Sequence, residues 1–462
     1  MKLDRRTLLK GLGAATSLGA LACERSPAAG ALSVTKALLR ERVKTVVFLM
    51  MENRSFDHVF GSLSLLEGRN DVDGLTPSMF NETLDGTRLS PAPADLMCVE
   101  DPAHGFDAAH LQWNAGACDN FVKVHEQRYG QGSAHRVMGY LDRSTAPTSY
   151  ALADHYALCQ RWFCSVMGPT WPNRYYSMLA TSNGFTNNVP VNVSLPSLYS
   201  RLDAAQVDWR QYYGNIAFSA LLVGHSLEQV EYQRLETFFD DAAAGTLPPF
   251  VHLDPIFGVN DDHPPSHPLS GQILLAAIYA ALAQSPQWHE SLLVVTYDEH
   301  GGFFDHVSPP TTKDDFENMQ QMGFRVPALV IGPYVKPQVS NTVLDHTSII
   351  ATLLRQHELP PLNTRDEAAN DLWSLLDATA LKDGTPADPI ALTPLALDDE
   401  VLNADECRGA GLHIAPGTPV PTGQPELDAW CDAHPSAKDG RQDAANHWAR
   451  IVARARSLAV VV

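Results

Sequence analysis

Residues 43–53 read VKTVVFLMMEN, a nearly continuous apolar run that stops at a carboxylate and an amide. Such a run is typical of a strand that is buried on both faces of a parallel sheet. Similar runs lie at 248–255 (PPFVHLDP), 291–302 (SLLVVTYDEHGG) and 325–334 (RVPALVIGPY), with helical patterns at 227–244 and 270–284. The sequence therefore predicts an α/β protein with a central, mainly parallel sheet flanked by helices.

The composition is that of a large globular protein. The chain has 462 residues, of which 45% are hydrophobic, and this is too apolar for a disordered chain. A formal net charge of −20 argues against nucleic-acid binding and gives no attraction to an anionic membrane. The total charge does not exclude a local basic pocket, and transient contact with a membrane surface stays open, as does the oligomeric state.

The N-terminal residues 1–23, MKLDRRTLLKGLGAATSLGALAC, read as an export signal. Arg5 and Arg6 precede a short Gly/Ala/Leu run that is unsuited to spanning a membrane, and together they resemble a twin-arginine signal. A disordered basic tail is the alternative. We expect cleavage near residues 22–30 and a periplasmic or secreted protein, with lipidation of Cys23 as a further option.

The cysteines permit disulfides without revealing their pairing. Six lie beyond Cys23, an even number that suits an exported protein: Cys98, Cys118, Cys159, Cys164, Cys407 and Cys431. Cys159 and Cys164 have no zinc-like spacing around them, so we interpret both as core or disulfide residues.

Polar side chains follow two of the predicted strands directly. Glu52 and Asn53 end the first run, and Asp298 and Glu299 end the run at 291–302. Ligands of parallel α/β sheets bind beyond the carboxyl ends of the strands, where these groups are expected to converge. Carboxylate and amide oxygens suit a hard divalent cation, which would also relieve their mutual repulsion. Gly301 and its neighbour Gly302 would let the backbone approach a ligand closely.

Residues 168–174, GPTWPNR, place Thr170 in a proline-fixed turn before a helical pattern. This arrangement presents a hydroxyl beside helix amides that favour an anion, and Arg174, one turn further on, could reach a phosphate. A helix cap is the alternative interpretation of Thr170. Three histidines lie in similarly polar surroundings: His104, His263 and His346.

With these residues assembled, the chain resembles the bacterial and plant phosphoesterase family of phosphatidylcholine-type phospholipases C and acid phosphatases, a branch of the alkaline-phosphatase fold. Seven stretches carry the resemblance in family order: MENRSFDHVFG at 51–61, HGF at 104–106, GPTWPNR at 168–174, NDDHPPSHPLSGQ at 260–272, YDEHGGFFDHV at 297–307, RVPALVIGPY at 325–334 and DHTSII at 345–350. The fourth and fifth look most like the non-specific phospholipases C.

The resemblance implies one divalent metal ion of unknown identity and a Thr nucleophile. The implied metal ligands are Glu52, Asn53, Thr170, Asp298 and Glu299. Thr170 matches the family's nucleophile, which also contacts the metal. Together with the N-terminal signal pattern and a change to Pro/Thr/Asp-rich sequence near residue 375, the resemblance predicts an export signal and linker at 1–30, a catalytic domain at 40–375 and a C-terminal appendage at 376–462 that packs on the same domain.

The remaining residues of the site are implied to handle the phosphoryl group. His104, His263 and His346 match residues that contact this group or assist the leaving group. Asn53 and Arg174 are expected to bind substrate. His300 stands where relatives often carry Asn and receives no catalytic role, and for His306 a structural bond at the strand exit is left open.

The implied activity is that of a phospholipase C, which cleaves phospholipid head groups through a phosphothreonine intermediate. An acid phosphatase acting on small phosphate esters at the same site is the alternative. A non-catalytic lipid- or metal-binding protein is a more remote alternative, because the nucleophile and the four strand-end ligands are all in place. The motifs do not distinguish diesters from monoesters.

Overall fold

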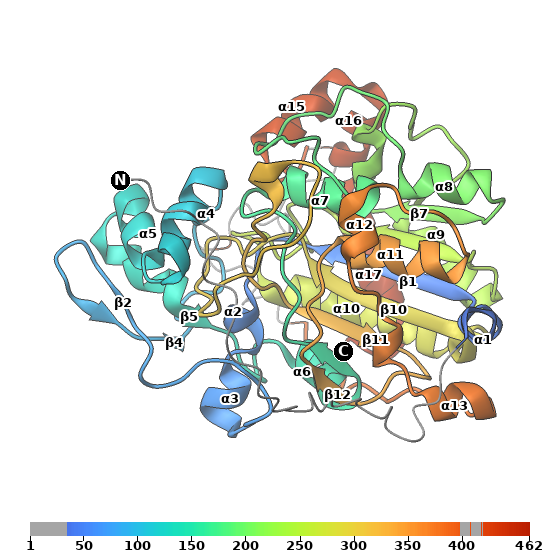
Figure 1. The fold of residues 1–462 in the computed structure, drawn as a ribbon, viewed down its shortest axis with the longest axis horizontal. Coiled ribbons are helices and arrows are strands. Elements are labelled where there is room, and N and C mark those ends of the chain that lie inside the picture. The colour runs from blue at the N-terminus through green and yellow to red at the C-terminus, as the bar shows by residue number, and fades with distance from the viewer. Residues whose placement is uncertain (1–34, 398–406, 408–416, 418) are drawn as a thin grey trace, which may run out of the picture. The chain divides into compact units, whose positions relative to one another are not determined.

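The computed structural model describes residues 35–397, 407, 417 and 419–462, so the predicted export signal at 1–30 and Cys23 lie outside the described residues. Within them, the central sheet has eight strands in the order β12-β6-β11-β10-β1-β9-β7-β8 (Figure 1). These strands are β1 Thr45–Met51, β6 Ala157–Cys159, β7 Trp209–Tyr213, β8 Tyr232–Arg234, β9 Phe250–Asp254, β10 Ser291–Tyr297, β11 Ala328–Ile331 and β12 Gln338–Ser340. The predicted α/β class with a mainly parallel sheet is confirmed.

Each of the four long apolar runs forms a strand, but one of them runs against the others. All pairings of the sheet are parallel except those that β11 makes with β10 and β6. Every side chain of β1 and β10 is buried, as expected for strands covered on both faces. Because β11 is antiparallel, its carboxyl end lies at the opposite edge from those of β1, β9 and β10.

Helices pack around the sheet in two groups. One group consists of α6 Pro147–His155, α9 Leu235–Ala244, α10 Pro268–Ala283 and α17 Ala444–Ser457. The other consists of α1 Lys36–Arg42, α7 Thr170–Leu179, α8 Leu198–Ala204, α11 Thr347–Gln356 and α12 Thr364–Ala368. The helix predicted at 227–244 is wrong in its first part, since β8 occupies 232–234 and pairs with β7 before α9 begins.

A smaller hydrophobic cluster lies under the segments that follow β1. Phe121, Val137 and Phe324 belong to it, and all three are buried. Its residues lie in or pack from α3 Ser62–Glu67, α4 Phe106–Trp113, α5 Phe121–Tyr129, the 3-10 helix at Gln131–Met138, the two-residue strands β3 Arg88–Leu89 and β5 Gly139–Tyr140, and neighbouring loops. These elements also contact α2 Phe56–Phe60 and the two-residue strands β2 Asn81–Glu82 and β4 Ala92–Pro93. The predicted loop at 62–103 thus contains one helix and three very short strands.

The C-terminal segment is helical where it is regular. It contains α13 Ala378–Asp383, α15 Pro425–Ala433, α16 Pro435–Gln442 and α17 Ala444–Ser457. The terminal helix predicted at 440–459 corresponds to α17, which packs against α10 and α9. Among the described residues, no helix combines the length and apolarity needed to cross a membrane.

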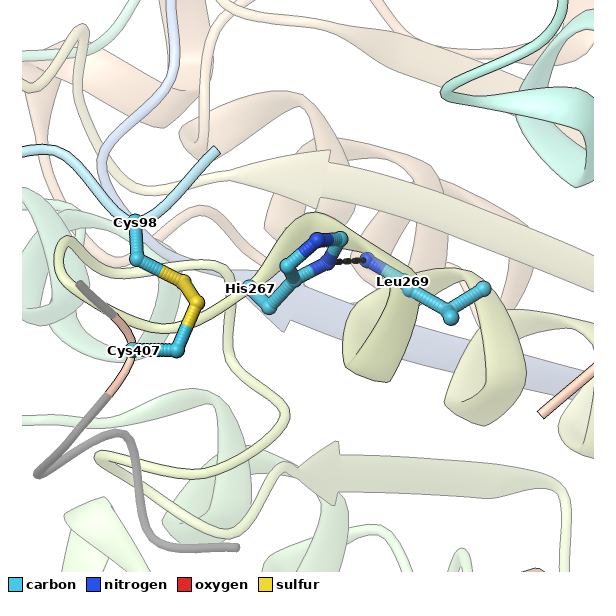
Figure 2. The surroundings of a disulfide bond; sticks show 4 residues. All are labelled: Cys98, His267, Leu269 and Cys407. Atoms are coloured by element: carbon cyan, nitrogen blue, oxygen red, sulfur yellow. Dashed lines mark hydrogen bonds between the residues drawn. A yellow bond between two sulfur atoms is a disulfide. The ribbon is translucent and has the colours of Figure 1, made fainter. Parts of the chain in front are cut away.

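A disulfide ties this segment to the loop that leads into α4. Cys98 and Cys407 are bonded across 309 positions of sequence (Figure 2). Figure 2 also shows the start of α10, where the backbone N–H of Leu269 donates to Nδ1 of His267 at 3.0 Å. Four of the described cysteines are free and buried: Cys118, Cys159, Cys164 and Cys431. For Cys159 and Cys164 the sequence left a core position or a disulfide open, and the structure places both in the core.

A buried ion-pair network fastens α2 to the loop after β10. Arg325 donates through Nη2 to Asp57 and through Nε to Asp305, both at 2.9 Å. His306 donates from Nδ1 to Asp57 Oδ2 at 2.6 Å and lies 3.1 Å from Asp73 Oδ1 through Nε2. The spacing of these acidic and histidine groups would admit a metal ion. The guanidinium already supplies the compensating charge, so this is a structural contact at the strand exit.

The stability of the fold is expected to depend on the protonation of His306. Burial lowers the pKa of His306, but the Asp57 carboxylate outweighs burial and raises it to about 9. The folded state therefore holds this proton more tightly than the unfolded chain, whose histidines titrate near pH 6.5. The stabilisation is complete below about pH 6.5 and is lost as the pH rises through about 9, with an upper limit of roughly 3 kcal/mol.

Urea unfolding of the wild type and of His306→Gln, at pH 6 and at pH 9.5, measures this effect. We expect the difference in unfolding free energy between the two proteins to be large at pH 6 and small at pH 9.5. An equal difference at both pH values would show that His306 contributes by packing and not by charge.

Candidate active site

The site is built where three parallel strands end at the same edge of the sheet. Met51 is in register with Tyr297, so the next residues, Glu52 and Asp298, leave β1 and β10 side by side. On the other side of β1, Asp254 ends β9. All three carboxylates are fully buried. Parallel pairing thus brings together acidic groups that are far apart in the sequence, as the strand-end argument predicts.

The turn after β1 interlocks with the turn after β10. Asn53 adopts a left-handed backbone conformation with φ of 61°, and its N–H donates to Asp298 Oδ1 at 3.0 Å. Gly301 lies so close that a Cβ there would be 2.1 Å from the carbonyl oxygen of Asn53. We had expected Gly301 to make room for a ligand; the close approach is to the backbone of the neighbouring turn.

Three buried oxygens at this point have no hydrogen-bond partner within the described protein: Asn53 Oδ1, Asp298 Oδ2 and Glu299 Oε1. The other oxygens of the two carboxylates accept backbone N–H groups, which fixes their orientation. Burial raises the pKa of Glu299 to about 8, and the neighbouring Asp298 adds to this. Buried acceptors without a hydrogen bond are costly, and carboxylate and amide oxygens are the ligands that a hard divalent cation prefers. The chemistry of these oxygens therefore fits a hard metal ion.

Glu52 differs from these ligands because protein donors already surround it. Arg174 Nε donates to its Oε1 at 3.1 Å, and the side-chain amide of Gln424 donates to both of its oxygens at 2.8 and 2.9 Å. His263 Nδ1 lies 3.4 Å from Oε2. Burial nevertheless raises the pKa of Glu52 well above its usual value, which shows how strongly this position opposes an isolated negative charge.

Thr170 is the first residue of α7 and is 1% exposed. The N-cap is Pro169 and no side chain caps the helix, so the alternative of Thr170 as a capping residue does not describe its position. The turn before it is held by the side-chain amide of Asn173, which accepts from Val166 N and donates to Val166, Gly168 and Pro169 carbonyl oxygens. Thr170 is thus presented from a fixed turn.

Arg174, one turn further along α7, points into the protein. Besides Glu52, its guanidinium contacts Asp254 Oδ1 at 3.3 Å and the Met50 carbonyl oxygen at 3.3 Å. It also lies 4.8 Å from the centre of the Phe257 ring. We had expected this group to reach a phosphate; its donors are instead used to join α7 to the ends of β1 and β9.

His104 lies near one of the unpartnered oxygens, and His263 lies next to His104. His104 Nδ1 donates to the Pro102 carbonyl at 2.7 Å, which leaves Nε2 facing Asn53 Nδ2 at 3.3 Å and Glu299 Oε1 at 3.9 Å. The His263 ring is 5.9 Å from that of His104, and its Nε2 lies 3.3 Å from Asp101 Oδ1. Although burial opposes it, the carboxylates led by Asp101 raise the pKa of His263 to about 10.

The third histidine has both ring nitrogens engaged. His346 donates from Nε2 to the Asp298 carbonyl oxygen at 2.6 Å, and its Nδ1 accepts from Trp162 Nε1 at 3.3 Å. Burial lowers the pKa of His346 to about 4, so the ring is neutral at physiological pH. His300 is also neutral, since burial lowers its pKa to about 3, and its Nε2 pairs with Gln112 at 2.8 Å.

Two groups of acidic and histidine residues at this edge have ligand atoms within 4.8 Å of one another, namely Asp101, His104 and His263, and Glu52, Asp261 and His263. Asp101, Asp254 and Gln424 also belong to the site, and none of them was predicted from the sequence. The apolar run ending at Asp254 was a usable signal, because it resembles the runs that end at Glu52 and Asp298. Nothing in the local sequence around Gln424 indicates its place in the site.

The chain is similar to proteins named phospholipase C and, at low identity, to a solved structure. Non-specific phospholipase C6 of Arabidopsis thaliana is 31% identical over 358 residues, covering 69% of this chain and 68% of the relative. Phospholipase C B of Mycobacterium tuberculosis is 29% identical over 411 residues, covering 73% and 78%. A solved protein of the alkaline phosphatase superfamily from Vibrio parahaemolyticus aligns over 71% of this chain and 69% of its own, with 12% identity and a TM-score of 0.38.

The family assignment rests on the part of the chain that carries all of the strand-end groups. The model of the Phosphoesterase family matches residues 43–360, from the start of β1 to beyond α11. This range also contains Thr170, His104, His263 and His346. The chain belongs to the Phosphoesterase family.

Proposed function

We propose that this phosphoesterase is a metal-dependent enzyme of the phospholipase C type that cleaves phospholipid head groups. The observation that carries the proposal is the set of three buried, unpartnered oxygens of Asn53, Asp298 and Glu299. The Arg174–Glu52 contact joins the helix that begins at Thr170 to this same edge. Relatives named phospholipase C, one from a plant and one from a bacterium, support the substrate class.

The cation would be held by Asn53, Asp298 and Glu299, with Glu52 and Thr170 completing the set that the family resemblance implies. When bound, it would lower the pKa of a hydroxyl ligand and offset the charge of the phosphate. The chain's own contribution is orientation. Three hydrogen bonds orient Asp298. The N–H groups of Asn53 and Glu299 donate to its Oδ1, and His346 donates to its backbone carbonyl oxygen.

The nucleophile is proposed to be the Thr170 hydroxyl. Its Oγ1 loses its proton to solvent and forms a bond to phosphorus as the bond from phosphorus to the diacylglycerol oxygen breaks, which leaves a phosphothreonine that still carries the head group. A water molecule then gives up a proton and displaces Thr170 from phosphorus, so that Oγ1 regains a proton and the phosphorylated head group is released. Two successive displacements give retention of configuration at phosphorus.

The histidines divide into two roles. His263, held in its charged form by Asp101 and Glu52, is the group suited to donate a proton to the departing alkoxide and to face the phosphoryl oxygens with positive charge. His104 faces the same space through Nε2. His346 has no free nitrogen, so we assign it, like Arg174, to positioning the metal ligands.

We also propose that the protein is exported by the twin-arginine route, on the strength of the Arg5–Arg6 pair. The Cys98–Cys407 disulfide supports an oxidising destination outside the cytoplasm. Residues 40–375 would then act as the catalytic domain, with 376–462 as an appendage to it.

Substitution of Thr170 tests the nucleophile. Thr170→Ala is expected to lower kcat by a factor of about 10³ or more, because no hydroxyl remains to attack phosphorus. Thr170→Ser keeps a hydroxyl and serves as the matched control, with activity closer to the wild type. Acid quenching during turnover should trap a phosphorylated wild-type protein and none for Thr170→Ala. Near-full activity of Thr170→Ala would refute the assignment.

Removal of the metal tests the unpartnered oxygens. Dialysis against a chelator is expected to abolish activity and to lower the melting temperature, since a ligand that binds only the folded state stabilises it. Asp298→Asn should lose this chelator-dependent change in melting temperature, while Asp71→Asn, on an exposed carboxylate paired with Arg69, should keep it. A wild-type protein that is insensitive to chelator in both measurements would contradict a metal site.

Product analysis distinguishes the phospholipase C from an acid phosphatase. Purified protein is incubated with phosphatidylcholine and, in parallel, with an aryl phosphate monoester. We expect release of phosphocholine and diacylglycerol with little turnover of the monoester. Turnover of the monoester alone would reject the phospholipase C and leave a phosphomonoesterase that uses the same residues.

A further inference from the structure

A short segment near the end of the chain closes one side of the site. Residues 421–424 lie beyond the family match, which ends at 360, yet they pack against residues of the catalytic edge. A Cβ placed on Gly423, whose φ is 79°, would be 2.5 Å from His263 Nδ1. A Cβ on Gly258 would likewise be 2.0 Å from the carbonyl oxygen of Pro421. Neither position leaves room for a side chain. The segment therefore packs closely, in a defined position, against the catalytic edge.

Gln424 is the member of this segment that reaches a proposed metal ligand. Its Nε2 donates to Oε1 and Oε2 of Glu52 at 2.8 and 2.9 Å. Its Oε1 accepts from the indole Nε1 of Trp171 at 2.9 Å. Because an indole nitrogen can only donate, the amide oxygen must face Trp171 and the amide nitrogen must face Glu52. The orientation of the Gln424 amide is therefore determined by chemistry.

The hydrogen bonds to Glu52 leave its two oxygens unequal. A carboxylate has about two acceptor positions on each oxygen. Oε1 receives both Arg174 and Gln424, whereas Oε2 receives only Gln424 as a hydrogen bond. Oε2 therefore has one hydrogen-bond donor fewer than Oε1, and the ring of His263 lies 3.4 Å from it through Nδ1. The two donors thus fix the orientation of the Glu52 carboxylate.

We propose that Gln424 is a positioning residue for the metal site. Its side-chain amide holds the Glu52 carboxylate in the orientation that binds the ion. The inference rests on the proposed function, since it takes Glu52 as a ligand. It extends the site to a residue of the C-terminal segment, and it links the ion to Trp171, the residue that follows Thr170 on α7.

The segment that carries Gln424 is itself anchored. Arg441 Nε donates to the Val420 carbonyl oxygen at 3.2 Å, and its Nη1 donates to the Asp428 carbonyl oxygen at 3.0 Å. The N–H of Thr422 donates to Asp428 Oδ1 at 3.0 Å. Pro425 then begins α15. With its backbone held on both sides, Gln424 has little freedom to move away from Glu52.

Metal affinity is the decisive measurement. The full chain is stripped of metal, and binding of Mn²⁺ is followed by the loss of the free-ion EPR signal, with Ca²⁺ titrated by calorimetry. Gln424→Leu keeps much of the side-chain volume and removes the amide. We expect it to weaken binding by about 10- to 100-fold, the usual effect of losing a partner of a ligand, and to lower kcat more than it raises KM.

Three further variants make the result interpretable. Gln284→Leu removes another side-chain amide that holds the C-terminal segment, by its bond to the Leu458 carbonyl oxygen, and should leave metal affinity unchanged. Trp171→Phe removes the donor that orients Gln424 and should weaken binding less than Gln424→Leu does. It tests the inference even where Gln424→Leu fails to fold. Asp298→Asn reports on the proposed site itself.

The outcomes separate the two proposals. Loss of affinity in Gln424→Leu and Trp171→Phe, with Gln284→Leu unchanged, supports the inference. Wild-type affinity in both Gln424→Leu and Trp171→Phe, together with weak binding in Asp298→Asn, would overturn the role of Gln424 and leave the proposed function standing. Wild-type affinity in Asp298→Asn would instead reject the metal site.

Discussion

Negative charge crowded at one edge of the sheet is the constraint on which the rest of the site depends. Glu52 and Asp298 follow β1 and β10, and Asp254 ends β9; the register of these parallel strands leaves the three carboxylates close together and fully buried. Carboxylates in such a setting cannot all be ionised without compensation. Arg174 supplies one positive charge from α7 and His263 supplies another. The unpartnered oxygens are what remains for a metal ion.

This compensation also fixes α7, the helix that begins at the proposed nucleophile, Thr170. A threonine on a surface helix would have no fixed relation to groups on the sheet. Here Arg174 joins α7 to Glu52 and Asp254, while Asn173 fixes the turn that precedes Thr170. Burying a guanidinium is unfavourable unless its N–H groups are hydrogen-bonded. The guanidinium of Arg174 also donates to the carbonyl oxygens of Met50 and Met51. The same side chain, Arg174, therefore balances charge at this edge of the sheet and holds the helix that begins at Thr170.

The strand ends could be predicted from sequence because two strong regularities coincide there. Unbroken apolar runs indicate buried parallel strands, and polar residues directly after them must lie at the carboxyl edge. Glu52, Asn53, Asp298 and Glu299 all satisfied this pattern. The direction of β11 was not predictable, because an apolar run carries no information on whether its neighbours run parallel to it.

The hydrogen-bond and ion-pair partners of the side chains in the site were harder to predict from the sequence. Arg174 lies in a motif with Thr170, and its type suits a phosphate as well as a carboxylate, so its inward direction depends on helix packing that no local pattern records. Asp101 and Gln424 follow no strand and belong to irregular segments. Such segments are positioned by tertiary contacts, here a disulfide at Cys98 and the bonds of Arg441.

The position of Gln424 bears on where the functional unit of this protein ends. The family match stops at residue 360, which is a statement about shared sequence. The hydrogen bonds of Glu52 do not stop there, since both of its oxygens accept from a residue 372 positions later. Removing the later segment would leave a buried carboxylate with fewer donors and a wall of the site missing beside His263. The proposed role of Gln424 would therefore extend the catalytic unit beyond residue 375, to residues 419–442, whose bonds hold that wall in place.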